Sequence, residues 1–185
     1  YCAASALASG AFFAYLGGAP FVGSTIFRLD PAHLGLFFGA PAVGYFFGNF
    51  LSGRFSVRFG VNRMVLAGAL MVTTGMALSL LVFAAGFGSE WTFFGFMTFV
   101  GLGNGMVLPN ATAGLLSVRP SLAGTASGLG GFLMIGGGAA LSALAGHLLT
   151  PESGVWPLLW IMFLCGAGAV ASALYVMARA RRVGA

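Results

Sequence analysis

Long apolar stretches alternate with short polar ones along the whole chain. A helix needs about 20 mostly apolar residues to cross the hydrocarbon core of a bilayer. Six stretches reach that length, at about residues 3–27, 33–52, 64–87, 91–118, 122–149 and 155–178. The pattern therefore predicts an all-α membrane protein, with six transmembrane helices in a single domain over residues 1–185.

The composition agrees with a membrane chain. Hydrophobic residues make up 59% and charged residues only 6%, and the mean hydropathy is +1.00, whereas about 25% of a soluble domain is charged. The net charge of +5 would suggest a nucleic-acid partner in a soluble protein. Here the basic residues lie in short polar segments, so we expect membrane lipid beside them and no nucleic acid.

The arginines indicate a membrane orientation. Seven follow the second, fourth and sixth stretches, namely Arg54, Arg58, Arg63, Arg119, Arg179, Arg181 and Arg182. The other three connections carry Arg28, Asp30, Glu90 and Glu152, and Asp30 offsets Arg28. Cytoplasmic loops are enriched in Lys and Arg. We therefore expect the arginine-rich side and both chain ends to be cytoplasmic.

The start of the sequence suggests a longer protein. Tyr1 is neither an initiator Met nor part of a basic leader, and the first apolar stretch follows almost at once. We expect a preceding N-terminal part, with a self-contained six-helix protein as the alternative.

Glycines recur at a spacing of four in two of the stretches. Gly44 and Gly48 lie in the second stretch, and Gly124 and Gly128 lie in the fifth. Small residues at this spacing let two membrane helices approach closely. The contacts can form within the chain, or with a helix-rich partner surface.

Two asparagines mark the fourth stretch as a candidate cavity wall. Asn104 and Asn110 lie close to Pro109 and several glycines. An amide is costly in hydrocarbon, so each side chain should face a neighbouring helix or a watery cavity. Pro109 removes a backbone hydrogen bond and permits bending. The alternative is a hydrogen bond between helices, combined with a kink.

The chemistry expected of an enzyme is missing from the sequence. No nucleophile elbow, phosphate loop, zinc-protease pair or Cys/His cluster with metal spacing occurs. We therefore predict no enzyme activity, no cofactor and no metal. No Asp, Glu, Lys or Arg lies at the central depth of a stretch. If protons drive the protein, the carboxylate that carries them must lie in another part.

The segment 53–63 resembles a known loop motif. Gly53, Arg58, Gly60 and Arg63 follow the pattern of glycines and basic residues found between helices of the major facilitator superfamily. Val57 stands at the position of the motif's acid, as in the degenerate copy between the eighth and ninth helices. The resemblance implies a conformational or gating role for these residues.

Two further segments narrow the resemblance. Residues 101–116, and residues 123–133 preceded by Arg119, are similar to the tenth helix and the start of the eleventh in the Bcr/CflA drug-resistance transporters. The chain then corresponds to helices seven to twelve. This implies a drug-efflux antiporter in a bacterial inner membrane, driven by protons, whose N-terminal six-helix half is not in this sequence.

The resemblance also implies roles for particular residues. The first and fourth helices would border a central cavity and place five side chains against a small amphipathic substrate: Phe12, Tyr15, Asn104, Met106 and Asn110. The second and fifth helices would line the contact between halves. Pro109 would allow bending during alternating access. The alternatives are a six-helix membrane scaffold or assembly subunit without transport, and a half-size transporter that dimerises.

Overall fold

The computed structural model describes residues 1–118 and 120–183. Within this part the chain is helical and contains no strand. Its elements are α1 (Cys2–Phe21), a π-helical turn (Val22–Ile26), α2 (Pro31–Phe38), α3 (Ala40–Phe59), α4 (Val61–Ala84), α5 (Glu90–Val118), a 3-10 turn (Pro120–Leu122), α6 (Ala123–Leu148) and α7 (Trp156–Val183). Counting α1 with its π turn and α2 with α3, six helices are long and apolar enough to cross a membrane. This confirms the predicted all-α chain with six candidate spans.

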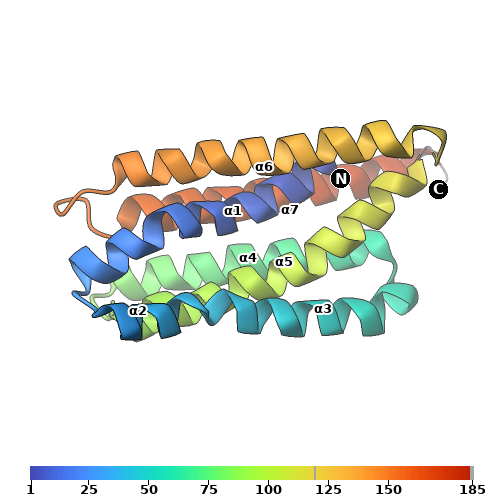
Figure 1. The fold of residues 1–185 in the computed structure, drawn as a ribbon. Coiled ribbons are helices and arrows are strands. Elements are labelled where there is room, and N and C mark those ends of the chain that lie inside the picture. The colour runs from blue at the N-terminus through green and yellow to red at the C-terminus, as the bar shows by residue number, and fades with distance from the viewer. Residues whose placement is uncertain (119, 184–185) are drawn as a thin grey trace.

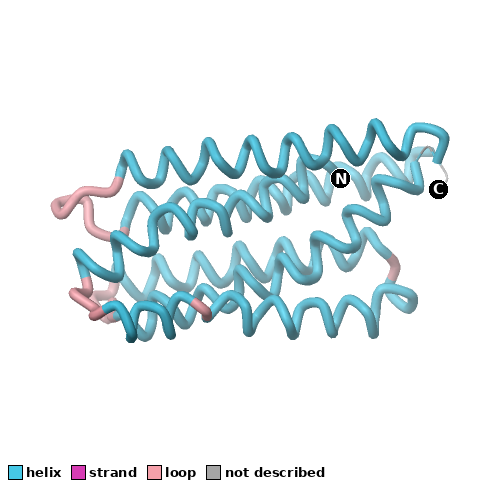
Figure 2. Tube along the Cα trace, in the orientation of Figure 1, coloured by secondary structure: helices cyan, strands magenta, loops and turns pink. Residues whose placement is uncertain are grey.

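The connections fall alternately at the two ends of the bundle (Figure 2). Segments 27–30, 85–89 and 149–155 lie at one end, called here the acidic end because it carries Asp30, Glu90 and Glu152. Gly60, the turn before α6, the start of α1 and the end of α7 lie at the other, the arginine end. Arg119 lies outside the described residues. The remaining arginines that follow even-numbered stretches are all on helix segments near the arginine end.

The segment 53–63 is mostly helical, which corrects its prediction as a loop. Gly53 and Arg58 lie within α3, and Arg63 lies in the first turn of α4. Only Gly60 separates the helices, with φ +82° and ψ 154°. A helix tolerates a glycine such as Gly53 at a cost of about 1 kcal/mol, whereas the backbone at Gly60 suits only glycine.

The second predicted span is interrupted near its start. Asp30 caps α2, since its carboxylate accepts hydrogen bonds of 3.0 Å from the backbone N–H groups of Ala32 and His33. A turn at Gly39 then separates α2 from α3. Pro41 lies in the first turn of α3, where a missing N–H costs little.

The helix packing has an internal exchange symmetry. α1 packs on α6 and α7, while α5 packs on α3 and α4; α1 also contacts α5, and α4 contacts α7. Exchanging α1 with α5, α3 with α6 and α4 with α7 leaves this set of contacts unchanged. Because two membrane spans lie between the members of each pair, the exchanged helices run in opposite directions (Figure 1).

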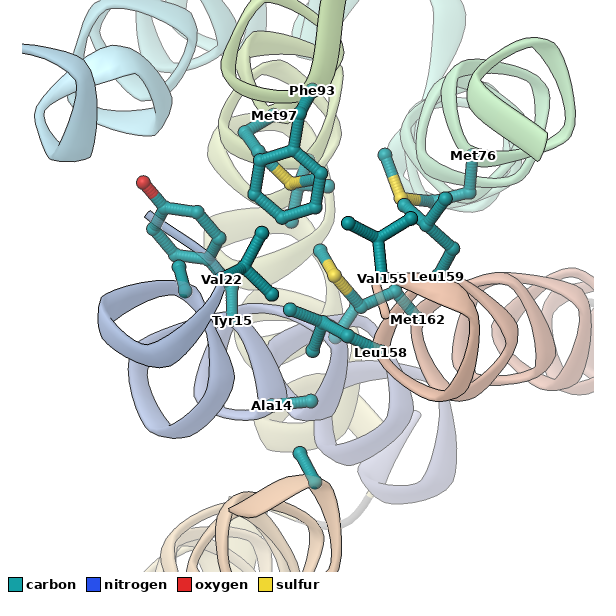
Figure 3. Close-up of a cluster of buried hydrophobic side chains, with 14 of the residues drawn as sticks. Ala14, Tyr15, Val22, Met76, Phe93, Met97, Val155, Leu158, Leu159 and Met162 are labelled. Carbon is teal, nitrogen blue, oxygen red and sulfur yellow. The ribbon is translucent and has the colours of Figure 1, made fainter. Parts of the chain in front are cut away.

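The helices form two layers. Figure 1 shows α6, α1, α5 and α3 in front, with α4 and α7 behind them. The large core cluster lies between the layers and includes Tyr15, Met76, Phe93, Met97 and Leu158 (Figure 3). α1 and α5 are the most buried helices, whereas α3 and α6 leave most of their surface exposed. The front face is thus flanked by two largely unburied helices.

The two glycine pairs differ in their surroundings. A Cβ atom at Gly44 or Gly48 would collide with the backbone carbonyl oxygens of Thr98 and Leu102, so this pair packs α3 tightly on α5 within the chain. At Gly124 and Gly128 no atom of the described chain lies within 4 Å of a Cβ position. Contact of the second pair with a partner therefore stays a prediction.

Candidate functional site

The front face contains a half-open cavity of about 400 Å³ between four helices. α1 and α5 form its floor, and α3 and α6 form its sides. Its lining includes Ser9, Phe12, Phe13 and Leu16 of α1, Phe38 of α2, Pro41, Ala42 and Tyr45 of α3, Gly101, Asn104 and Leu108 of α5, and Met134 of α6. We call it the front cavity. An apolar pocket with few polar groups is the usual form of a small-molecule site.

Asn104 supplies an amide to the floor of this cavity. The residue is 3% exposed, and its Oδ1 atom has no hydrogen-bond partner among the described residues. A buried polar atom without a partner costs free energy that a bound donor would recover. Asn104 lines the front cavity; that its amide orients a ligand there stays a prediction.

Aromatic side chains make much of the wall. Phe12 and Phe13 lie together on α1, with ring centroids 6.4 Å apart. Tyr45 faces them from α3 and is 43% exposed. Flat apolar rings and the flexible Met134 give a surface that suits ligands of varied shape. Phe12, which the sequence predicted to face a substrate, lines this cavity; contact with a substrate stays a prediction.

The cavity continues toward the arginine end as a more polar space of about 440 Å³. Tyr45, Leu108 and Met134 line both parts. The continuation adds Asn49, whose Nδ2 donates a 2.8 Å hydrogen bond to the Tyr45 carbonyl oxygen. Further polar side chains there are Ser5, Thr112 and Ser127. We call the two parts together the front groove; within the described lining, no Asp, Glu, Lys or Arg occurs.

Tyr15 lies outside the groove, contrary to the expectation that it faces substrate. It is fully buried, and its hydroxyl donates a 3.0 Å hydrogen bond to the Phe38 carbonyl oxygen. Its ring stacks on that of Phe38, with centroids 5.1 Å apart. Tyr15 is three residues beyond Phe12, which turns it about 60° around the helix, toward α2 and the core.

Met106 and Asn110 also point elsewhere. Met106 is buried where α5 meets α4, close to Gly68. Asn110 donates hydrogen bonds to the Ser52 hydroxyl of α3, at 2.7 Å, and to the Met106 carbonyl oxygen, at 2.8 Å. At about 100° per residue, positions 106 and 110 cannot share the face of Asn104. For Asn110, the alternative of a hydrogen bond between helices is the correct one.

Sequence reasoning missed the contribution of the second stretch to this cavity. Phe38, Tyr45 and Asn49 line the groove, although that stretch was expected to contact a partner half. A signal was available, because Tyr45 and Asn49 are four residues apart and so share one face of α3. Met134 of α6 had no comparable signal in the sequence.

The residues expected to act in gating occupy two separate places. Pro109 is exposed and lines the polar part of the groove, and α5 continues through it as one helix. Arg58 and Arg63 lie at the arginine end, where they line another cavity together with Gly60. The Arg58 guanidinium carbon lies 5.5 Å from the ring centroid of Phe59.

Within the described part of the chain, no group of three or more His, Cys, Asp or Glu side chains is placed to hold a metal ion. Comparison of the chain with models of protein families, with curated proteins and with solved structures gives no match.

Proposed function

We propose that the chain is one six-helix half of a secondary active transporter of the major facilitator superfamily, similar to the Bcr/CflA exporters. The observation that carries the proposal is the exchange symmetry of the packing, in which two three-helix units of opposite direction make equivalent contacts. Inverted three-helix repeats within each six-helix half characterise that superfamily. Transport proceeds by alternating access, with this half rocking against a second one.

The front groove is the part of the substrate site that this half contributes. Its apolar walls and the Asn104 amide suit a small amphipathic molecule. Carboxylate side chains are missing from its described lining, so in this proposal the carboxylate that takes up the driving proton belongs to the other half. Asn104, Phe12 and Tyr45 orient the substrate in this proposal.

The flanking helices provide the surface for the second half. Phe46 and Phe50 of α3 are 69% and 64% exposed, and Phe132 of α6 is 72% exposed. Gly124 and Gly128 leave open space along α6, which is the arrangement that close helix packing in a membrane requires. The N-terminal six-helix half packs here, in a bacterial inner membrane with the arginine end in the cytoplasm.

A six-helix scaffold is the second candidate, because the open glycines of α6 suit a partner helix of any membrane protein. The two functions differ in what happens to the groove. A transporter exposes it to each side of the membrane in turn, whereas a scaffold covers it permanently.

Cysteine accessibility in the full-length protein separates the two. After Cys2 and Cys165 are replaced by Ala, a single cysteine at Ala42 of the front cavity is treated with a membrane-impermeant maleimide from each side. The transporter proposal expects labelling from both sides, with rates that shift in opposite directions when an amphipathic substrate is added. Leu164→Cys on α7, at a residue that is 61% exposed and does not line the groove, should remain unlabelled.

Protection of the cysteine at position 42 from both sides under every condition would favour the scaffold. Labelling from one side alone, unchanged by substrate or by a proton gradient, would contradict alternating access.

A further inference from the structure

A second cavity, of about 590 Å³, opens at the arginine end of the bundle. Three arginines from three helices line it: Arg58 of α3, Arg63 of α4 and Arg181 of α7. Asn62 and Ser117 add polar groups. We call it the basic cavity. A preference for cytoplasmic arginines explains why they lie at this end, but it does not require three of them to surround one space.

No carboxylate side chain neutralises these arginines. The only acids in the sequence are Asp30, Glu90 and Glu152, and all three lie at the acidic end. In the described part of the chain, the one ion pair joins Asp30 to His33. Like charges brought together repel one another. An anion bound in the basic cavity would therefore reduce the electrostatic repulsion among the three arginines.

The backbone adds to the positive field. α4 begins at Val61 after Gly60, which offers no side chain to cap it. The first N–H groups of a helix have no partner within the helix, and its dipole favours an anion there. Gly60, Val61, Asn62 and Arg63 all line the basic cavity. The start of α4 and the three guanidinium groups therefore act on the same space.

An apolar cavity of about 660 Å³ lies beside the basic one. Tyr1 lines both. The rest of its wall is mainly apolar and comes from α1, α5, α6 and α7, including Leu115, Val118, Ala171, Tyr175 and Val176. Such a wall suits a hydrocarbon chain, which free phosphate does not possess.

We propose that these neighbouring cavities bind one anionic phospholipid, with its phosphate among Arg58, Arg63 and Arg181 and an acyl chain along the apolar cavity. Guanidinium groups bind phosphate oxygens through paired hydrogen bonds, and basic pockets between membrane helices on the cytoplasmic side bind lipid headgroups. The proposal does not depend on the transport proposal, because the basic cavity shares no lining residue with the front groove and the apolar cavity shares only Leu115 with it.

The test is native mass spectrometry of the whole chain, released from detergent in the presence of phosphatidylglycerol or of phosphatidylcholine with the same acyl chains. Phosphatidylglycerol should stay bound at energies that remove phosphatidylcholine. In R58Q/R63Q/R181Q, the affinity for phosphatidylglycerol should fall by about tenfold or more, because each arginine near a lipid surface contributes substantially to the binding free energy.

The chain offers a matched control at the same end. R54Q/R179Q/R182Q removes the same charge from residues that do not line the basic cavity, and it should weaken binding by less than about twofold. An equal loss in both triple variants would show that only the general surface charge matters, and would overturn the site.

Lysine variants and competition with inorganic phosphate test the proposal further. R58K/R63K/R181K retains the charge and should keep most of the binding even if the glutamine variant misfolds; complete loss in a folded lysine variant would contradict the proposal. Inorganic phosphate should not displace phosphatidylglycerol at equal concentration. Displacement would identify a free phosphate site and overturn the assignment to a lipid.

Discussion

The side-chain amide of Asn110 on α5 donates a 2.7 Å hydrogen bond to the hydroxyl of Ser52 on α3, 58 residues earlier in the chain. Ser52 continues the row of small residues formed by Gly44 and Gly48, at the same spacing of four. The glycines let the two backbones approach, and the hydrogen bond joins the helices one turn farther along. An amide expected to meet substrate therefore holds the fold together.

Replacing Asn110 should lower stability without changing substrate preference. Asn110→Ala removes a buried hydrogen bond between helices, and such bonds in membrane proteins contribute about 0.6 to 1.7 kcal/mol. We expect the free energy of unfolding in mixed micelles to fall by about 1 kcal/mol. Because Ser52→Ala removes the same bond, the double variant should lose less than the sum of the two. Strict additivity would contradict the pairing.

Close packing at the α3–α5 crossing predicts that alanine substitution lowers stability at Gly101 but not at Gly128. A Cβ at Gly101 would collide with the carbonyl oxygen of Pro41, which is backbone and cannot turn aside. We expect Gly101→Ala to destabilise the chain by about 1–3 kcal/mol. Gly128→Ala, with open space beside it, should leave thermal stability unchanged or slightly raised. Similar effects of the two substitutions would be inconsistent with this packing.

The link between α3 and α4 depends on the backbone of Gly60. With φ at +82° and ψ at 154°, this residue occupies a region that is essentially restricted to glycine, so Gly60→Ala should cost about 1–3 kcal/mol. Gly53→Ala is the matched control, because Gly53 is helical and has no described atom within 4 Å of its Cβ position. It should stabilise the chain by up to about 1 kcal/mol. Chemical unfolding of both variants measures the difference.

The cap of α2 should weaken in acid. The hydrogen bond from the backbone N–H of His33, together with its ring N–H bond to the other carboxylate oxygen, lowers the pKa of Asp30 below its usual 3.8. A lowered folded pKa means that the contribution to stability is complete above pH 3.8 and is lost as the pH falls through the folded value. Hydrogen exchange at His33, corrected for its intrinsic pH dependence, should accelerate over that interval. In Asp30→Asn the corrected rate should stay constant with pH; the same acceleration there would assign it to another group.

The number of spans could be predicted from the sequence because twenty apolar residues without charge have few alternatives to a membrane helix. Helix ends were harder to predict. Nothing in the residues between Gly53 and Gly60 stops a helix, so the polar character of that segment was mistaken for a loop. Polarity indicates where a chain leaves hydrocarbon, which need not be where its helix ends.

The candidate site was predicted only in part. Asn104 and Phe12 reach the front cavity, but Tyr15, Met106 and Asn110 are buried elsewhere. α1 and α5 are buried on several sides, so hydrophobic periodicity does not reveal which face remains open. Which face remains open depends on where the neighbouring helices lie. The sequence around Asn110 does not indicate that Ser52 lies close to it.

The most direct test of the transport proposal is proton-driven movement of an amphipathic fluorescent dye in inverted vesicles that contain the full-length protein. We expect uptake that requires a pH gradient and falls by about tenfold or more in Asn104→Leu, since the substrate then loses its polar contact with the Asn104 amide. The control Thr98→Val changes a hydroxyl that bonds within α5 outside the cavity and should transport normally at equal abundance. Absence of gradient-dependent uptake, or full activity in Asn104→Leu, would contradict the account.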